Sequence, residues 1–324
     1  MRMLKKLLNK SVVITGASSG AGRAAAIEFA LCGAKLTLAA RNEEVLDEVA
    51  AECRRLGAEV LVVATDVTDA KAMISLANAA NYFFGRIDVW VNNAGVLAAG
   101  PFDEMPMAMH EQVIRTNLLG YMNGAHAVLP IFKAQKRGII INNISIGGFI
   151  PMPYGAGYTA SKFALRGFNE ALKAELTPWP YIYVCDLFPA FLDTPGIQHA
   201  GNYTGKVLKP APPVYDPRRV GKAMVDVAVR PQATRYVGSV SVLLKLAHAI
   251  FPQTMANATA GMVRTYLKQA DEISKTDGNV YSTVNYGMSP YGGFGWPGKP
   301  RAHRKYIAAA ALVGLATGLW MVNK

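Results

Sequence analysis

Apolar runs alternate with segments of helical spacing along the first 190 residues of the chain. The runs at 11–15, 60–64 and 138–144 lack the alternation of apolar and polar positions that a half-exposed strand shows, so they are typical of strands buried on both faces of a parallel sheet. Segments such as 43–56, which is followed by Gly57, carry apolar residues at helical spacing. Strand–helix units of about 25–30 residues predict a doubly wound α/β sheet of the Rossmann type.

The other expected elements continue this order. We expect strands at 36–40, 87–91, 181–187 and near 235–237, and helices at 69–84, 115–135, 157–176 and 217–229. After residue 190 the alternation weakens, and 239–270 is expected to be helical. The predicted organisation is a basic lead at 1–10, a Rossmann-type domain at 11–240, a helical extension with a Gly/Tyr/Pro linker at 241–300, and a terminal segment at 301–324.

A glycine-rich turn lies between the first expected strand and the first expected helix. It reads Thr15-Gly16-Ala17-Ser18-Ser19-Gly20-Ala21-Gly22. Glycines permit a tight turn and a close approach of the backbone to a pyrophosphate, and the helix that follows offers free N–H groups to an anion. A purely structural turn is the alternative, but the position of the motif favours dinucleotide binding.

The residues after the second expected strand indicate which dinucleotide is bound. An acidic residue there would hold the ribose 2′-hydroxyl of NAD, whereas this chain has Ala39-Ala40-Arg41. Arg41 can pair with a 2′-phosphate, and Arg23 can help it. The alternative is that Arg41 is simply solvated. We interpret the pattern as favouring NADP(H) over NAD(H).

Tyr158 and Lys162 are four residues apart on an expected helix, so they lie on one face of it. A free phenol has a pKa of about 10, and a neighbouring ammonium favours the phenolate and lowers that pKa. Ser145, at the end of an apolar strand, can hydrogen-bond the same substrate oxygen. These residues predict proton transfer to or from a substrate oxygen.

In these motifs and their order the chain resembles the short-chain dehydrogenase/reductase family over roughly residues 8–240. The matching motifs are TGASSGAG at 15–22, Asn92-Asn93-Ala94-Gly95, Ser145, and Tyr158 with Lys162. The resemblance implies hydride transfer between a nicotinamide and a carbonyl or alcohol carbon. It implies a catalytic set of Asn117, Ser145, Tyr158 and Lys162, in which Asn117 anchors a water that relays protons through Lys162.

The resemblance also implies the cofactor contacts. Asp66 and its neighbour Val67 would lie at the adenine, Asn93, Ala94 and Gly95 would support the ribose and the central strand, and Pro189 and Thr194 would border the nicotinamide. With the residues of the turn, the expected cofactor set is Gly16, Ser18, Ser19, Gly20, Ala21, Gly22, Arg41, Asp66, Val67, Asn93, Ala94, Gly95, Tyr158, Lys162, Pro189 and Thr194. Three positions depart from the usual family pattern: Ala21, Ile144 and Ala190. None of them removes a catalytic group.

Charge and cysteines narrow the function classes. The net charge of +12 comes largely from residues 1–10 and from the stretch after Asp277. The rest of the chain carries only a small excess of positive charge. A nucleic-acid binder would carry a basic stripe on a folded face, so we expect no nucleic-acid partner. Cys32, Cys53 and Cys185 have no CxxC spacing and lie in apolar surroundings, so we interpret them as buried free thiols in a reducing compartment. The histidine spacing predicts no metal site, and the short lead before the first strand is no signal peptide, so the catalytic domain is expected in the cytoplasm.

The terminal segment predicts membrane attachment. The uncharged run from Ile307 to Val322 follows Arg301, Arg304 and Lys305 and has aromatic residues near both ends. It is short for a bilayer span, and a buried helix or a contact in a homo-oligomer is the alternative. Residues 240–251 are also apolar, and we read them as a core helix or as a membrane-facing lip. We expect a lipophilic carbonyl/alcohol substrate; a soluble reductase of small polar carbonyls and a non-catalytic NADP-binding scaffold are the alternatives.

Overall fold

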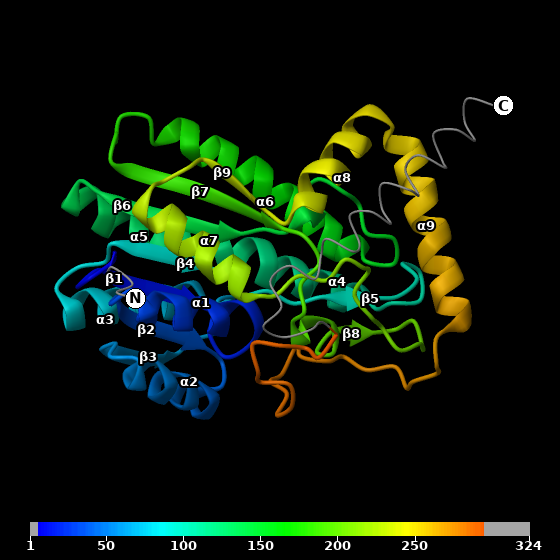
Figure 1. Cartoon of the computed structure of the whole chain (residues 1–324), viewed down its shortest axis with the longest axis horizontal. Coiled ribbons are helices and arrows are strands. Elements are labelled where there is room, and N and C mark those ends of the chain that lie inside the picture. The colour runs from blue at the N-terminus through cyan, green and yellow to red at the C-terminus, as the bar shows by residue number, and fades with distance from the viewer. Residues whose placement is uncertain (1–5, 295–324) are drawn as a thin grey trace.

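The computed structural model describes residues 6–294 (Figure 1). Its centre is a seven-stranded parallel sheet in the order β3-β2-β1-β4-β6-β7-β9. The strands are β1 (Ser11–Thr15), β2 (Lys35–Ala40), β3 (Val60–Ala64), β4 (Val89–Asn92), β6 (Gly138–Asn143), β7 (Ile182–Pro189) and β9 (Thr234–Val237). The predicted doubly wound α/β sheet of the Rossmann type is confirmed.

Helices cover both faces of this sheet. On one face, α1 packs against α2 and α7, and on the other, α3 packs against α5 while α4 packs against α6. Their bounds are α1 (Gly20–Leu31), α2 (Glu43–Arg55), α3 (Ala70–Phe84), α4 (Met107–Ile114), α5 (Gly120–Gln135), α6 (Ala156–Glu175) and α7 (Arg218–Val229). Two large apolar clusters fill the space between helices and sheet, one on each side. Burial on both faces explains why the strands read as continuous apolar runs.

One helix differs from its prediction. The helix expected at 115–135 begins earlier, because α4 leads without a break into a π-helical turn at Arg115–Leu119 and then into α5. Pro106 precedes α4, where the missing N–H of a proline costs nothing. A π-turn inserts one extra residue into a helix, which local apolar spacing does not reveal.

The region after the sheet consists of two helices and a long irregular segment. Helix α8 (Ser239–Ile250) and helix α9 (Pro252–Gln269) pack on each other beside the carboxyl ends of the strands (Figure 1). A second, two-stranded sheet pairs β5 (Ala98–Ala99) with β8 (Gly201–Asn202). After α9 the chain returns toward α1 as a long irregular segment. We call residues 277–294 of this segment the strap.

Within residues 6–294 no helix has the length and apolar character needed to cross a bilayer. The basic flank and the run from Ile307 to Val322 lie outside the described residues. The division of the chain at residue 240 stays a prediction. In the described part of the chain, the three cysteines are free thiols; Cys53 and Cys185 are buried as expected, whereas Cys32, at the end of α1, is only half-buried.

Candidate active site

The candidate site lies at the carboxyl ends of the strands, where the order of the sheet reverses on either side of β1. Ligands of open α/β sheets bind at such a point, because the loops leaving neighbouring strands part there and open a crevice. The glycine-rich turn follows β1, and the Asn93–Gly95 segment follows β4, which pairs with β1. The topology therefore brings both motifs to the same place.

Steric contacts explain why the turn needs its glycines. Gly16 has a φ of +65°, and a Cβ there would lie 2.6 Å from the Cα of Ala94. A Cβ on Gly22 would lie only 2.0 Å from the carbonyl oxygen of Gly16. Asn93 fixes the turn from the other side, since its Nδ2 donates to the carbonyl oxygens of Thr15 and Gly16 at 3.0 and 3.1 Å. The backbone of the turn is thus fixed by contacts within the protein itself.

Ser145 and Tyr158 converge at the end of β6. A hydrogen bond joins their side chains, and a Cβ built on Gly147 would lie 3.0 Å from a ring carbon of Tyr158 and 3.5 Å from Ser145 Oγ. Ser145 has a φ of +109° and a ψ of 156°, a conformation that costs a non-glycine residue about 1–3 kcal/mol. Strain of this kind is typical of functional positions, and here it directs the hydroxyl toward the phenol.

Lys162 is buried one helical turn after Tyr158. Its Nζ lies 5.7 Å from the centre of the Tyr158 ring and 5.1 Å from that of Tyr121. Burial lowers the pKa of Lys162 to about 7, because the ammonium loses its hydration. Burial also raises the pKa of Tyr158, although the hydrogen bond from Ser145 opposes this. The pKa of Tyr158 is therefore raised and not lowered as expected, because the loss of hydration outweighs the hydrogen bond from Ser145.

Asn117 lies in the π-helical turn and is completely buried. Its side chain accepts from the Val96 N–H at 2.8 Å and donates to the Val96 carbonyl at 2.9 Å and to Ser161 Oγ at 3.2 Å. A Cβ on Gly95 would lie 3.2 Å from Asn117 Oδ1 and 3.9 Å from Lys162 Nζ. Asn117, Lys162 and the Asn93–Gly95 segment are therefore close neighbours, as the resemblance implied. The water relay stays a prediction.

At the expected adenosine end, Arg41 follows β2 and Asp66 follows β3. Asp66 Oδ1 accepts from the Thr68 N–H and hydroxyl at 2.9 and 2.8 Å, and the carbonyl of the next residue, Val67, accepts from Asn123 Nδ2. Burial lowers the pKa of Arg41, and the Asp66 carboxylate opposes the shift.

The two arginines of this end are already in hydrogen bonds. Arg41 donates to the carbonyl oxygens of Asn279, Tyr281 and Ser282. Arg23 donates to the Met288 carbonyl at 2.7 Å and pairs with Glu52. Sequence reasoning missed these partners. An uncharged stretch rich in glycine and tyrosine has no periodicity, so the pattern indicates only a linker.

At the expected nicotinamide end, Pro189 ends β7, and Thr194 lies beside the glycine-rich turn, 3.3 Å from a Cβ built on Gly20. Ala190, which departs from the family pattern, is buried with Tyr215 and Val240. Its methyl group thus contributes to the contact between the end of the sheet and α8.

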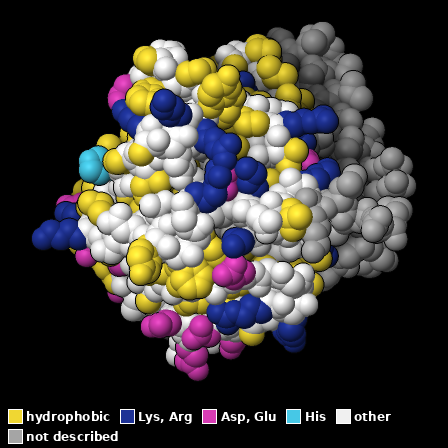
Figure 2. All heavy atoms as spheres, turned by 90° about the vertical axis from the view of Figure 1, so that its left-hand side faces the viewer, with side chains coloured by type: hydrophobic (Ala, Val, Ile, Leu, Met, Phe, Trp, Pro, Cys, Tyr) yellow, Lys and Arg dark blue, Asp and Glu magenta, His cyan; other side chains and the backbone are white. Residues whose placement is uncertain are grey.

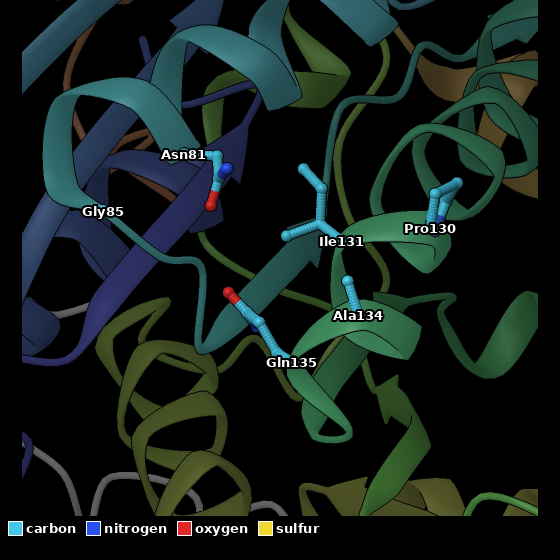
Figure 3. Close-up of a pocket in the computed structure, with 6 residues that line it drawn as sticks. All are labelled: Asn81, Gly85, Pro130, Ile131, Ala134 and Gln135. Atoms are coloured by element: carbon cyan, nitrogen blue, oxygen red, sulfur yellow. The ribbon is translucent and has the colours of Figure 1, made fainter.

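The amino ends of the strands lie at the opposite end of the molecule from this site. Figure 2 shows that end of the molecule, where lysine and arginine side chains gather in the upper half and acidic ones lie mostly below them. A shallow pocket between α3 and α5 opens there (Figure 3), lined by Asn81, Gly85, Pro130, Ile131, Ala134 and Gln135. Gln135 is bonded to the backbone N–H and carbonyl of Ile87 at 3.0 and 2.7 Å, so its role there is to hold the start of β4.

Ser145, Tyr158 and Lys162 converge at the carboxyl ends of the strands of a Rossmann-type sheet. This combination of fold and residues is typical of oxidoreductases that use a nicotinamide cofactor. A profile of the family described as short chain dehydrogenase matches residues 10–202. The chain belongs to the short-chain dehydrogenase/reductase family of oxidoreductases.

Relatives and solved structures agree with this assignment. The chain is 34% identical to an uncharacterized oxidoreductase, YxnA, of Bacillus subtilis over 77% of this chain and 71% of that protein. It is 32% identical to a 3-dehydrosphinganine reductase of Danio rerio over 83% of this chain and 86% of that protein. A metagenomic short-chain oxidoreductase crystallised with NADP superposes with a TM-score of 0.62 at 30% identity, covering 72% of this chain and 98% of that one.

Proposed function

We propose that this protein interconverts a carbonyl and an alcohol with NADP(H), using Tyr158 as the acid/base. The observation that carries the proposal is the convergence of Ser145 and Tyr158 beside the buried Lys162. When bound, the nicotinamide supplies or accepts the hydride. The chain's own residues orient the substrate oxygen and move its proton.

Each side chain has a defined task in this proposal. The Tyr158 phenol gives its proton to the carbonyl oxygen during reduction, and the raised pKa of Tyr158 favours the protonated form needed for that step. The Ser145 hydroxyl holds the same oxygen, and its strained backbone fixes its direction. The Lys162 ammonium stabilises the phenolate left after proton transfer. Asn117 would anchor the water that returns a proton through Lys162.

The residues present fit NADP(H). A glycine-rich turn without Cβ atoms lies before the N-terminus of α1, where N–H groups suit a pyrophosphate. At the end of β2, Ala39 and Ala40 leave no carboxylate to repel a 2′-phosphate, and Arg41 and Arg23 are the cations that would hold it. The NADP complex of the metagenomic relative supports this choice.

A lipophilic substrate reached from a membrane surface is the finer part of the proposal. On α8, Val240 is buried and Leu244 packs beside it, whereas Leu243, Leu246 and Ile250 are more than half exposed. The core-helix interpretation of 240–251 therefore holds for one face only. Residues 227–270 contain no acid but include Arg230, Arg235, Lys245, Arg264 and Lys268, which suits an anionic lipid surface. The Danio rerio relative is named as a 3-dehydrosphinganine reductase, and this name supports a lipophilic substrate.

The test of the reaction is turnover of a carbonyl and alcohol panel followed by nicotinamide absorbance. Tyr158→Phe should lower kcat by about 10²–10⁴-fold, the usual contribution of general acid–base catalysis, with little change in NADPH affinity. Tyr82→Phe is the control, because that tyrosine is 93% exposed on α3. Retention of most activity in Tyr158→Phe would remove Tyr158 from the mechanism, and NADPH binding without any turnover would favour the scaffold alternative.

The test of membrane attachment is removal of residues 301–324. The truncated protein should leave the membrane fraction and keep its NADPH affinity, while turnover of membrane-dissolved carbonyls falls and turnover of water-soluble ones is kept. Unchanged partitioning, or loss of folding, would assign 307–322 to the protein interior or to an oligomer contact. A preference for small polar carbonyls in the intact protein would favour the soluble-reductase alternative.

A further inference from the structure

The strap crosses the place where the proposed cofactor would lie. Figure 1 shows it returning from the end of α9 toward α1 and α2. Val280, completely buried, fixes its beginning in a cluster with Val96 and Met109. At its end, Gly292 and Phe294 donate their N–H groups to the carbonyl and the carboxylate of Asp193 at 3.1 and 2.8 Å.

Between these two ends, backbone carbonyls of the strap bind groups that the proposed function assigns to the phosphates of NADP(H). The Gly20 N–H, at the start of α1, donates to the Ser289 carbonyl at 3.1 Å. The Arg41 guanidinium donates to the Asn279 carbonyl at 2.6 Å and to two further strap carbonyls. The Arg23 guanidinium reaches the Met288 carbonyl.

These contacts compete with a dinucleotide because they use the same donors. The Gly20 N–H has one hydrogen, and the Ser289 carbonyl fills the position in front of it. The strap also lies against Thr194, since a Cβ on Gly292 would be 2.6 Å from the Thr194 carbonyl oxygen. A phosphate oxygen is charged and accepts more strongly than a neutral carbonyl. It would therefore displace the strap carbonyls from the N–H group and from the guanidinium groups.

The composition of the strap suits reversible displacement. Apart from Asp277 at its start, which accepts from the Tyr203 hydroxyl, the strap carries no charged side chain, so its acceptors toward the two arginines are weak, neutral carbonyls. Residues 278–294 form neither helix nor strand and contain glycines at 278, 287, 292 and 293. Most of its side chains are exposed or half-buried, and a segment with few buried apolar contacts opens locally at low cost.

We propose that the strap is an intramolecular clasp whose carbonyls occupy the cofactor's phosphate positions and which NADP(H) must displace in order to bind. This inference rests on the proposed function, because it concerns the regulation of the same site. Cofactor binding then depends on the fraction of molecules with the strap open, and the apparent Kd rises in inverse proportion to that fraction. Opening of the strap is the conformational step that admits the dinucleotide.

Two variants loosen the strap without touching the cofactor groups. In Tyr286→Ala, the strap loses a hydroxyl that donates to the Gln198 carbonyl at 3.3 Å and a ring that packs on His199. In Gly287→Val, the new side chain collides with His199, since a Cβ there would lie 2.7 Å from its Nε2. Asn285→Ala is the matched control, because Asn285 is an exposed neighbour on the same strap.

The experiment is NADP⁺ titration of the full-length variants together with hydrogen exchange of peptides covering 277–294. Each loosened variant should lose about 1 kcal/mol of strap contact, which raises the fraction of open molecules about fivefold. The apparent Kd for NADP⁺ should therefore fall about fivefold in both loosened variants and stay unchanged in Asn285→Ala. In the unaltered protein, NADP⁺ should increase exchange at the Asn279 and Gly292 amides, which donate to His199 and Asp193 when the strap is closed.

Each outcome has a defined meaning. NADP⁺ binding that leaves exchange in the strap unchanged or slows it would overturn the clasp and make the strap a fixed wall of the site, while the proposed function stands. The same holds if the loosened variants bind NADP⁺ no better, or less well, than Asn285→Ala. Absence of dinucleotide binding in every variant would overturn the proposed function and the clasp together, whereas binding in the loosened variants alone would support the clasp.

Discussion

The seven-stranded sheet with its helices and the C-terminal arm formed by α8, α9 and the strap are stabilised in different ways. In the sheet region, residues such as Leu165, Val91 and Trp90 are completely buried. In the arm, α9 has no buried residue at all, and the strap is held mainly by hydrogen bonds between its backbone and residues of the sheet region. One region is defined by close packing and the other by a few directional contacts.

This difference separates two roles at one site. The side chains that we propose to be catalytic come from the packed region, where the π-turn around Asn117 and the strained Ser145 are kept in place by their surroundings. The strap, which we propose covers the cofactor crevice, belongs to the arm, which can move without breaking the core. A rigid base with a displaceable cover allows a precise site to open and close.

The largest contrast should appear on truncating one leucine in each region. Leu165→Ala on α6 removes a side chain with no exposure and should cost about 2–5 kcal/mol of unfolding free energy, because it leaves a cavity. Leu246→Ala on α8, where the side chain is 53% exposed, should cost less than about 0.5 kcal/mol. Denaturant unfolding measures both. Equal losses would mean that α8 is part of the packed core.

Arg41 joins the two regions, and its removal should act on the cofactor more than on the fold. Arg41→Ala should weaken NADPH by about 1.5–3 kcal/mol and NADH much less, because a charge-assisted bond to the 2′-phosphate is lost. Titration of both cofactors measures the difference, with Arg55→Ala on the exposed side of α2 as the control. Equal weakening of NADPH and NADH would show that Arg41 does not recognise the 2′-phosphate.

Lys162 should give the packed region a pH-dependent stability. Its folded-state pKa is about 7, against about 10.4 for an unperturbed lysine, so the unfolded chain binds an extra proton between these values. Unfolding free energy should therefore rise with pH from about 7 to 10, by at most about 1.4 kcal/mol per pH unit from this group.

Comparing Lys162→Met with the wild type isolates that contribution. The cofactor-free variant should be more stable than the wild type near pH 7.5, with a gap that closes as the pH rises, and it should be inactive. Lys222→Met, at an exposed position of α7, is the control. A gap that does not change with pH would show that Lys162 keeps its ordinary pKa.

The smallest expected effect compares two helical glycines that have open space around them. A Cβ on Gly167 in α6 or on Gly261 in α9 would meet nothing within 4 Å. Gly167→Ala should add about 0.5–1 kcal/mol and raise Tm by roughly 2–4 °C, because alanine has the higher helix propensity. Gly261→Ala should leave the main thermal transition unchanged if the arm opens before the core does. An equal rise in both variants would make α9 part of the same cooperative unit.

Most of the sheet region could be predicted from the sequence. Continuous apolar runs mark strands covered on both faces, and helical spacing marks the segments between them, so β1, β3 and α2 lie within a residue of their expected bounds. The glycine-rich turn, Ser145, Tyr158 and Lys162 could be found because the chemistry they serve needs specific residue types at short, regular separations. The pKa direction of Tyr158 could not be found in this way, because it depends on how deeply the ring is buried.

By itself, then, the sequence determined the α/β architecture, the family and the residues that converge at the carboxyl edge of the sheet, since each leaves a local pattern of polarity or residue type. Only the tertiary structure decided how the strap lies. The contact between Arg41 and Asn279 joins residues 238 positions apart. The acceptor is a backbone carbonyl, which every residue possesses, so the identity of residue 279 does not indicate the contact. Contacts of that kind become visible only when the chain is folded.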